Sequence, residues 1–176
     1  MKNFLSIESV EIALEKELTS VKASMLKYIE ICNNNPQDIE AQLSELRRFR
    51  STSYESLNQL QHEWLLIKVL KWLNSVYNIP LDSTNGYLIQ WNPRQTGGID
   101  EPDIRIINKR NELEINCEAS SSEKPVGVIN DRIKKHLLCL SKLNGIKYYF
   151  VLTDKMKQKA ETIIRNSGWN IEVRKL

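Results

Sequence analysis

Residues 101–120 read Glu-Pro-Asp-Ile-Arg-Ile-Ile-Asn-Lys-Arg-Asn-Glu-Leu-Glu-Ile-Asn-Cys-Glu-Ala-Ser, and this stretch decides the fold. Segments 103–107 and 113–119 alternate Ile and Leu with polar residues, and the charged, Asn-containing segment 108–112 separates them. Alternation of period two on both sides of turn residues is typical of a β-hairpin. The sequence therefore predicts two antiparallel strands.

The apolar residues also predict the register of this hairpin. A turn centred on residues 110–111 pairs Ile106 with Ile115 on an apolar side. The same register places Asp103 directly opposite Glu118 on the other side. A slip of one residue would put the isoleucines of one strand on the same side as the carboxylate of the other. The apolar pattern therefore favours the register that brings the two acids together.

Two opposed acids on neighbouring strands can form a cation site. Their Cβ atoms are expected about 4.5–5.5 Å apart, and carboxylates at that spacing can share a cation that binds oxygen at about 2.1 Å, the distance of Mg²⁺. Ser120 points to the same side as Glu118 because side chains alternate along a strand. The alternative is a solvated hairpin face with scattered acids.

The composition excludes several classes of protein. The chain has 176 residues and a net charge of +3, which permits an anionic partner without requiring one. No apolar run approaches the roughly 20 residues of a membrane span, and the acidic first 20 residues do not resemble a signal peptide. A cytoplasmic protein is therefore expected. Three scattered cysteines, two histidines and no Gly-x-x-x-x-Gly-Lys motif argue against a disulfide framework, a zinc site, a Ser-His-Asp triad and a P-loop.

The first part of the chain predicts helices. Apolar residues three and four apart indicate one amphipathic helix over residues 4–31. A second helix is expected from Pro36 to about Phe49, with three arginines at its end. Basic residues in a last turn suit the helix dipole, and phosphate contact is the alternative role.

A third helix is predicted to open with a capping box at Thr52 and Glu55 and to run to about Asn74. Its inward side is expected to carry Leu57, Leu60, Trp64, Ile67 and Leu70. Glu63 shares that side by its spacing, and burial of a carboxylate is costly unless something binds it. Glu63 is thus either an edge residue that reaches water or a third acid near the pair.

A short strand is predicted over residues 87–91, and a polar loop over 92–100 follows it. The paired Gly97 and Gly98 would expose backbone amides and allow the close approach of a ligand, and Arg94 could meet a phosphate. An ordinary hairpin loop explains the two glycines as well.

The remaining chain predicts a helix over 126–143, an apolar strand over 146–152, a helix over 155–166 ending at Gly168, and a last strand over 169–173. The first of these helices is expected to carry Val126, Ile129, Ile133, Leu137 and Leu140 inward. A strand-helix-strand crossover implies a parallel pair within a mixed sheet. We predict a mixed α/β core domain over 53–176, with its central sheet flanked by helices, and an N-terminal helical region over 1–52.

Pro102-Asp103 opens the second predicted strand and Glu118-Ala119-Ser120 closes the third. With these residues so placed, the order of elements resembles the PD-(D/E)XK nuclease superfamily over about residues 53–152. The resemblance implies a restriction-endonuclease-like core.

The resemblance also implies a set of metal ligands. Mg²⁺ would be held by Asp103, Glu118 and the backbone carbonyl of Ala119. Glu63 would match the further acid that many members carry on the preceding helix.

One departure from the family concerns its lysine, which Ser120 replaces. A neutral hydroxyl can position water but is a poor base. Either water activated by the metal suffices, or a nearby cation such as Lys124 or Lys134 fills in. The Glu-x-Ser ending looks like that of type IIS restriction enzymes and of their small catalytic subunits, which pair with a larger chain that reads the DNA sequence.

The implied activity is Mg²⁺-dependent hydrolysis of phosphodiester bonds in double-stranded DNA, with a heterodimer or a homodimer as the assembly. Contacts to phosphate are expected from the loop glycines and from Arg94, Arg105, Lys124, Arg132 and Lys135. Three alternatives stay open. The chain is a DNA-binding subunit with a decayed site, a repair or junction nuclease, or a helical interaction module that works through residues 1–50.

Overall fold

The structure is a computed structural model that describes residues 2–4, 6–34, 38–81, 86–93, 101–108, 110 and 113–176, without the side chains of Lys2, Thr52 and Glu55. The chain divides into two compact units. Residues Met1–Ile7 and His62–Leu176 form the sheet unit, and Glu8–Gln61 form the helical unit.

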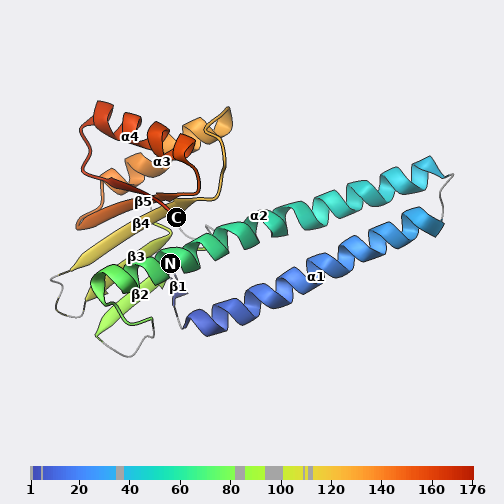
Figure 1. Ribbon diagram of the computed structural model, residues 1–176, viewed down its shortest axis with the longest axis horizontal. Helices are drawn as coiled ribbons and strands as arrows, with labels where there is room; N and C mark the ends of the chain where they lie inside the picture. Colours follow the sequence, from blue (N-terminus) through green and yellow to red (C-terminus); the bar gives the residue numbers. More distant parts are fainter. Residues whose placement is uncertain are drawn as a thin grey trace. The chain divides into compact units, whose positions relative to one another are not determined.

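The helical unit is a pair of antiparallel helices. It comprises α1 (Ile7–Asn34) from residue 8 onward and the first part of α2 (Ile39–Tyr77), which lie side by side (Figure 1). The rings of Tyr28 and Phe49 stack at 5.7 Å between the two helices.

The second and third helices of the sequence prediction are one continuous helix, α2, so that prediction is wrong at residues 49–52. Thr52 therefore caps no helix, and the three arginines near residue 49 lie in a helix interior, where Arg48 pairs with Glu45 at 2.7 Å. No Gly or Pro occurs within α2. A Ser or Thr inside a helix lowers its stability by only a few tenths of a kcal/mol. The capping residues near residue 52 therefore did not end α2, because no helix-breaking residue accompanies them.

The described part of the sheet unit forms one sheet of six strands in the order β1-β2-β3-β4-β5-β6. They are β1 (Lys2–Asn3), β2 (Tyr87–Trp91), β3 (Ile104–Asn108), β4 (Glu114–Ser120), β5 (Ile146–Val151) and β6 (Glu172–Lys175). Strands β1 to β4 pair antiparallel, whereas β4, β5 and β6 pair parallel. The predicted mixed α/β class with a parallel crossover is therefore confirmed.

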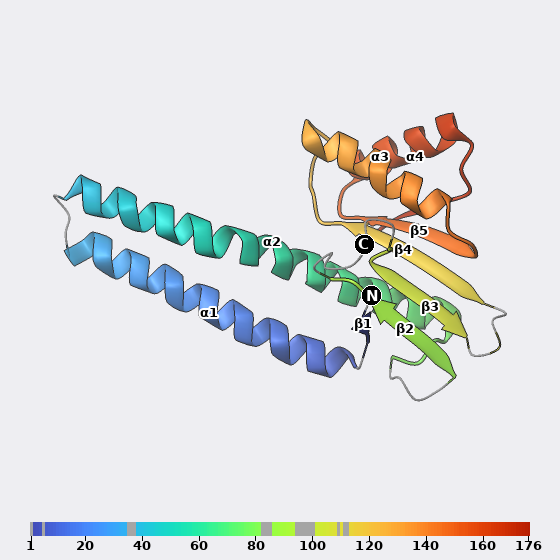
Figure 2. The same cartoon turned by 180° about the vertical axis from the view of Figure 1, so that it is seen from behind.

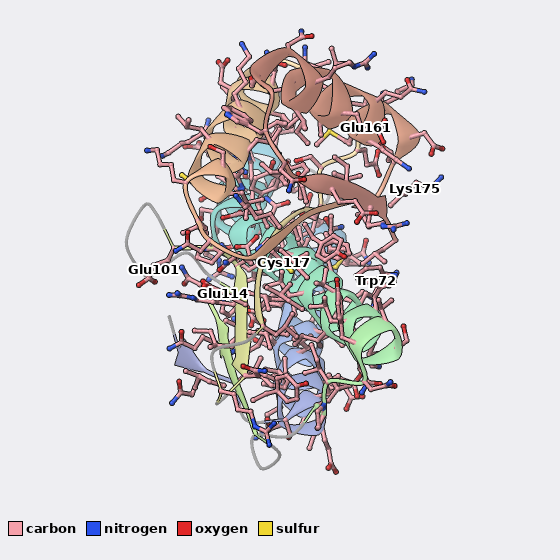
Figure 3. The ribbon with its side chains drawn as sticks, turned by 90° about the vertical axis from the view of Figure 1, so that its left-hand side faces the viewer. Trp72, Glu101, Glu114, Cys117, Glu161 and Lys175 are labelled. Carbon is pink, nitrogen blue, oxygen red and sulfur yellow. The ribbon has the colours of Figure 1, made fainter. Side chains whose placement is uncertain are left out.

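Helices cover both faces of this sheet (Figure 2). Helices α3 (Val128–Ser141) and α4 (Asp154–Ser167) cover one face, where they bury Tyr149 and Val151 of β5. The next residues of β5 point the opposite way, because side chains alternate along a strand. The ring centroids of Tyr148 and Phe150 lie 5.2 and 5.4 Å from that of Trp72 on α2. Figure 3 labels Trp72.

The hairpin has the predicted register. Ile104 pairs with Cys117, Arg105 with Asn116, and Ile106 with Ile115. The four apolar side chains of these pairs are at most 1% exposed. The requirement to bury them therefore sets the pairing of β3 with β4.

Several details of the sequence prediction are wrong. Strand β1 was not predicted, and the last strand begins at Glu172 rather than at residue 169, because the chain first leaves α4 through Gly168 in a left-handed conformation. Helix α3 starts at Val128. Three side chains predicted to point inward are exposed instead, namely Leu57, Trp64 and Val126.

Gly145 provides a test of the β4–β5 pairing. It has φ of +73°, and a Cβ atom there would overlap the backbone carbonyl of Glu114. Gly168 has a similar φ of +65° with open space around it. We expect Gly168→Ala to lower the free energy of unfolding by about 1 kcal/mol, and Gly145→Ala to cost at least about twice as much. Urea unfolding of both variants measures the difference, and equal losses would contradict the overlap.

Candidate metal centre

Asp103 lies immediately before β3 and is 2% exposed. Its Oδ2 accepts a hydrogen bond of 2.9 Å from the backbone N–H of Ala119 on β4. This bond reaches across the hairpin beyond the paired residues. It fixes the carboxylate at the end of β4, next to the side chain of Glu118.

Glu118 is also buried, at 5% exposed. Burial, and then the charge of the adjacent Asp103 and a hydrogen bond with that carboxyl, raise the pKa of Glu118 well above its usual value. The predicted meeting of the two acids is thus present in the structure. Two carboxylates in so little space need a proton or a cation between them.

Two histidines, which the sequence interpretation set aside, flank this pair. His62 on α2 places Nε2 at 3.4 Å from Oδ1 of Asp103. His136 on α3 places Nδ1 at 2.7 Å from Oε2 of Glu118. The helices on the two faces of the sheet therefore each contribute one imidazole. They were missed because they lie far from the hairpin in sequence, and no spacing rule connects them to it.

The pKa values of the two imidazoles shift in opposite directions. Burial lowers the pKa of His62, but the adjacent Asp103 outweighs burial and raises it overall. Burial lowers the pKa of His136, and Arg132 and Lys135 lower it further, against an opposing effect of Asp103. The pKa of Glu118 is raised while that of His136 is lowered, so both shifts oppose a charged pair at their contact of 2.7 Å.

Ser120 lies two residues after Glu118 on β4, so its side chain points to the same side of the sheet as that of Glu118. Its side chain is buried and is hydrogen-bonded to Tyr149 of β5, which is 1% exposed. Burial raises the pKa of Tyr149, and the hydrogen bond with Ser120 opposes that rise. Tyr149 is a second residue that sequence reasoning missed, because it reads there only as part of an apolar strand.

The other predicted site residues lie in different places. Glu63 is buried at 6% exposed, but its neighbour His62 is the α2 residue that contacts Asp103. Arg105 pairs with Glu114 at 2.8 Å. Lys124, Arg132, Lys134 and Lys135 are exposed, the last three on α3 beside His136. Arg94, Gly97 and Gly98 lie outside the described residues.

The acid pair offers two carboxylates to a candidate cation site. Within the described ranges, no three His, Cys, Asp or Glu side chains are arranged to hold one metal ion, so Glu63 completes no three-acid group. The ligand set implied by the resemblance needs only Asp103, Glu118 and one backbone carbonyl. Three buried atoms at the pair form no well-aligned hydrogen bond, namely Nε2 of His62, Oε2 of Glu118 and Nδ1 of His136. A cation would offset the crowded negative charge of the two carboxylates.

Comparison with protein-family models, with curated proteins and with solved structures found no significant match. In the part of the chain that the structure describes, no helix is both long enough and apolar enough to cross a membrane. What the site does is therefore inferred from its own geometry.

The raised pKa of Glu118 predicts a pH-dependent stability. The folded protein binds this proton more tightly than the unfolded chain, so the contribution of Glu118 is complete below its usual pKa of 4.5 and is lost as pH rises toward the folded pKa. Glutamine has no proton to lose. With a metal chelator present, we expect the melting temperature of Glu118→Gln, relative to the unmodified chain, to rise between about pH 5 and pH 8. A difference that is the same at both pH values would contradict the raised pKa.

Proposed function

We propose that the chain is a metal-dependent DNA endonuclease that hydrolyses phosphodiester bonds. The observation that carries this proposal is the buried, adjacent pair of Asp103 and Glu118 on the β3–β4 hairpin. Paired carboxylates with surplus negative charge suit a hard divalent cation such as Mg²⁺. The hairpin, the α3 crossover and parallel β5 agree with a restriction-endonuclease-like core, and a type II restriction endonuclease, or the small catalytic subunit of one, is the narrower form of the proposal.

Each residue of the site has a role in this proposal. Asp103 and Glu118 would hold Mg²⁺, together with the carbonyl of Ala119. When bound, the ion would stabilise negative charge on the phosphodiester under attack. His62 and His136 limit the rotation of the two carboxylates through contacts at 3.4 and 2.7 Å.

Ser120 occupies the position of the family's lysine and brings no positive charge. Its hydroxyl, hydrogen-bonded to Tyr149, would orient the attacking water. Helix α3 brings positive charge from another direction. Arg132 precedes His136 by four residues, which is one helical turn, and Lys135 is its immediate neighbour. Both act on the pKa of His136, so their charge is felt at the site, and the DNA backbone would pass along this part of α3.

The two acids can be tested directly. Supercoiled plasmid is incubated with the purified chain and Mg²⁺ or Mn²⁺. We expect Asp103→Asn and Glu118→Gln each to lower the cleavage rate by at least about 100-fold, the scale of removing one group that stabilises the transition state. Glu123→Gln, an exposed acid three residues after Ser120, serves as the matched control and should cleave normally. Cleavage by either site variant at the unmodified rate would contradict the proposal.

Metal binding separates an active site from a decayed one. Calorimetric titration with Mn²⁺ should show binding to the unmodified chain that is absent from both site variants. Failure of the unmodified chain to bind Mn²⁺ would instead favour a DNA-binding subunit without catalysis, which is consistent with the missing lysine.

The proposed DNA path along α3 predicts a change in salt dependence. Replacing Arg132 and Lys135 together by Gln removes two positive charges that would each neutralise a phosphate. The slope of log K against log salt should then become shallower by about 0.9 for each phosphate that is no longer neutralised. Lys155→Gln, an exposed lysine on α4, should leave the slope unchanged. Fluorescence anisotropy with a labelled duplex in Ca²⁺ measures both, and identical slopes would exclude this path.

A further inference from the structure

Two tryptophans on α2 each hold a cation over their ring. The Nζ of Lys71 lies 5.7 Å from the centroid of the Trp64 ring. The guanidinium of Arg174 on β6 lies 5.7 Å from the ring centroid of Trp72. Lys68 comes four residues after Trp64 and four before Trp72, so it shares their side of the helix. We call these five residues the tryptophan patch, and all of them belong to the sheet unit.

The patch includes the exposed side of α2 in the sheet unit. Trp64 is 46% exposed, although tryptophan is highly buried on average, and Lys68 and Lys71 are exposed as well. The other sides of this part of the helix are buried. Six apolar side chains there are at most 1% exposed: Leu65, Leu66, Ile67, Val69, Leu70 and Leu73. The side left to solvent therefore carries an aromatic ring and two ammonium groups, followed by the uncharged Ser75 and Val76.

The charge of the patch is positive. Between residues 62 and 77 the only acidic residue in the sequence is Glu63, which is buried at 6% exposed. Arg174 also pairs with Glu172, which partly offsets its charge. Lys68 and Lys71 therefore provide most of the positive charge, and the patch fits an anionic ligand.

An exposed ring beside cations fits a nucleotide of an unpaired strand. Proteins bind single-stranded nucleic acid by stacking bases on aromatic side chains and by contacting the phosphates with cations. Trp64 offers the ring, and Lys68 and Lys71 offer the charge. A double helix hides the faces of its bases within the stack, and an acidic peptide has no base to stack. The combination of ring and charge therefore favours a single strand over both.

The patch is separate from the acid pair. Trp64 follows His62 by two residues, which turns its side chain by about 200° around α2, and His62 is the residue that reaches Asp103. A strand bound at Trp64 would thus leave the candidate cation site open. Trp72 marks the inner limit of the patch, because its ring already packs against the rings of Tyr148 and Phe150.

We propose that the tryptophan patch binds single-stranded DNA, with a base stacked on Trp64 and the adjoining phosphates at Lys68 and Lys71. The choice of DNA over RNA rests on the proposed function, whereas the binding of a single strand does not. A nuclease with such a surface would favour substrates that carry an unpaired segment over fully paired duplexes.

The stacked base is tested by fluorescence anisotropy with a labelled oligothymidylate, in EDTA so that no cleavage occurs. We expect Trp64→Ala to weaken binding by at least about fivefold, the scale of losing one stacked base. Trp64→Phe keeps a ring and should bind more tightly than Trp64→Ala. Leu88→Ala is the matched control, because Leu88 on β2 is 40% exposed, and circular dichroism shows that the variants fold. Equal weakening by the control, or no binding by the unmodified chain, would overturn the proposal.

Stacking also has a spectroscopic signature. The chain contains four tryptophans, and oligothymidylate should quench their combined fluorescence by stacking on Trp64. Trp64→Phe still binds the strand but lacks the quenched group, so most of the quenching should disappear. Quenching that persists in this variant would place the strand elsewhere on the molecule and contradict the assignment.

The phosphate contact is tested by salt dependence. Lys68→Gln should make the slope of log K against log salt for oligothymidylate shallower by about 0.7, the value for one phosphate of a single strand. Lys155→Gln, an exposed lysine on α4, should leave the slope unchanged. Identical slopes for the two variants would exclude Lys68 from the binding surface.

The class of ligand is tested by competition. Poly-L-glutamate carries charge without bases and should displace the labelled strand far less than unlabelled oligothymidylate does. Equal displacement would overturn the proposal and indicate an acidic protein partner, and tighter binding of oligouridylate would overturn the choice of DNA. Trp64→Ala should leave the affinity for a duplex unchanged, and an equal loss for duplex and single strand would contradict stacking. These outcomes are measured without metal, so they do not depend on whether the acid pair cleaves DNA.

Discussion

One hydrogen bond positions the acid pair of this molecule: the backbone N–H of Ala119 donates to the carboxylate of Asp103. That bond forms only if β3 and β4 pair in the register that buries Ile104 against Cys117. The need to remove apolar side chains from water therefore also brings Asp103 beside Glu118. Packing provides the stabilisation, and the two acids are held together despite their repulsion.

The acid pair opposes the stability of the fold that carries it. Two carboxylates at 2% and 5% exposure lose hydration and repel each other. The structure keeps this pair, contacts it with His62 from α2 and His136 from α3, and pairs Ser120 with Tyr149. Unfavourable electrostatic interactions are therefore concentrated at one point of the fold. Such concentrations mark functional sites, where a ligand supplies the missing charge.

Sequence predicted the parts of the fold that depend on local pattern. Period-two alternation set the hairpin register, and a continuous apolar run identified β5. The polar residues near residue 52 suggested that a new helix starts there, but α2 is continuous. A capping residue does not end the preceding helix unless a helix-breaking residue such as Gly or Pro is also present. The site residues that the sequence predicted correctly are those that belong to the hairpin itself. His62, His136 and Tyr149 come to the acids through tertiary packing of α2, α3 and β5, which leaves no signature in the spacing of residues.

The edges of the sheet bear on how copies of this chain can meet. Strand β1 is only two residues long, and β6 carries Glu172, Arg174 and Lys175. Short or charged outer strands resist the addition of another strand, since a newcomer finds few free backbone groups or must bury charge. Strand-to-strand growth toward aggregates is disfavoured at both ends. A protein with such guarded edges can expose apolar helical surface at a lower risk of uncontrolled assembly.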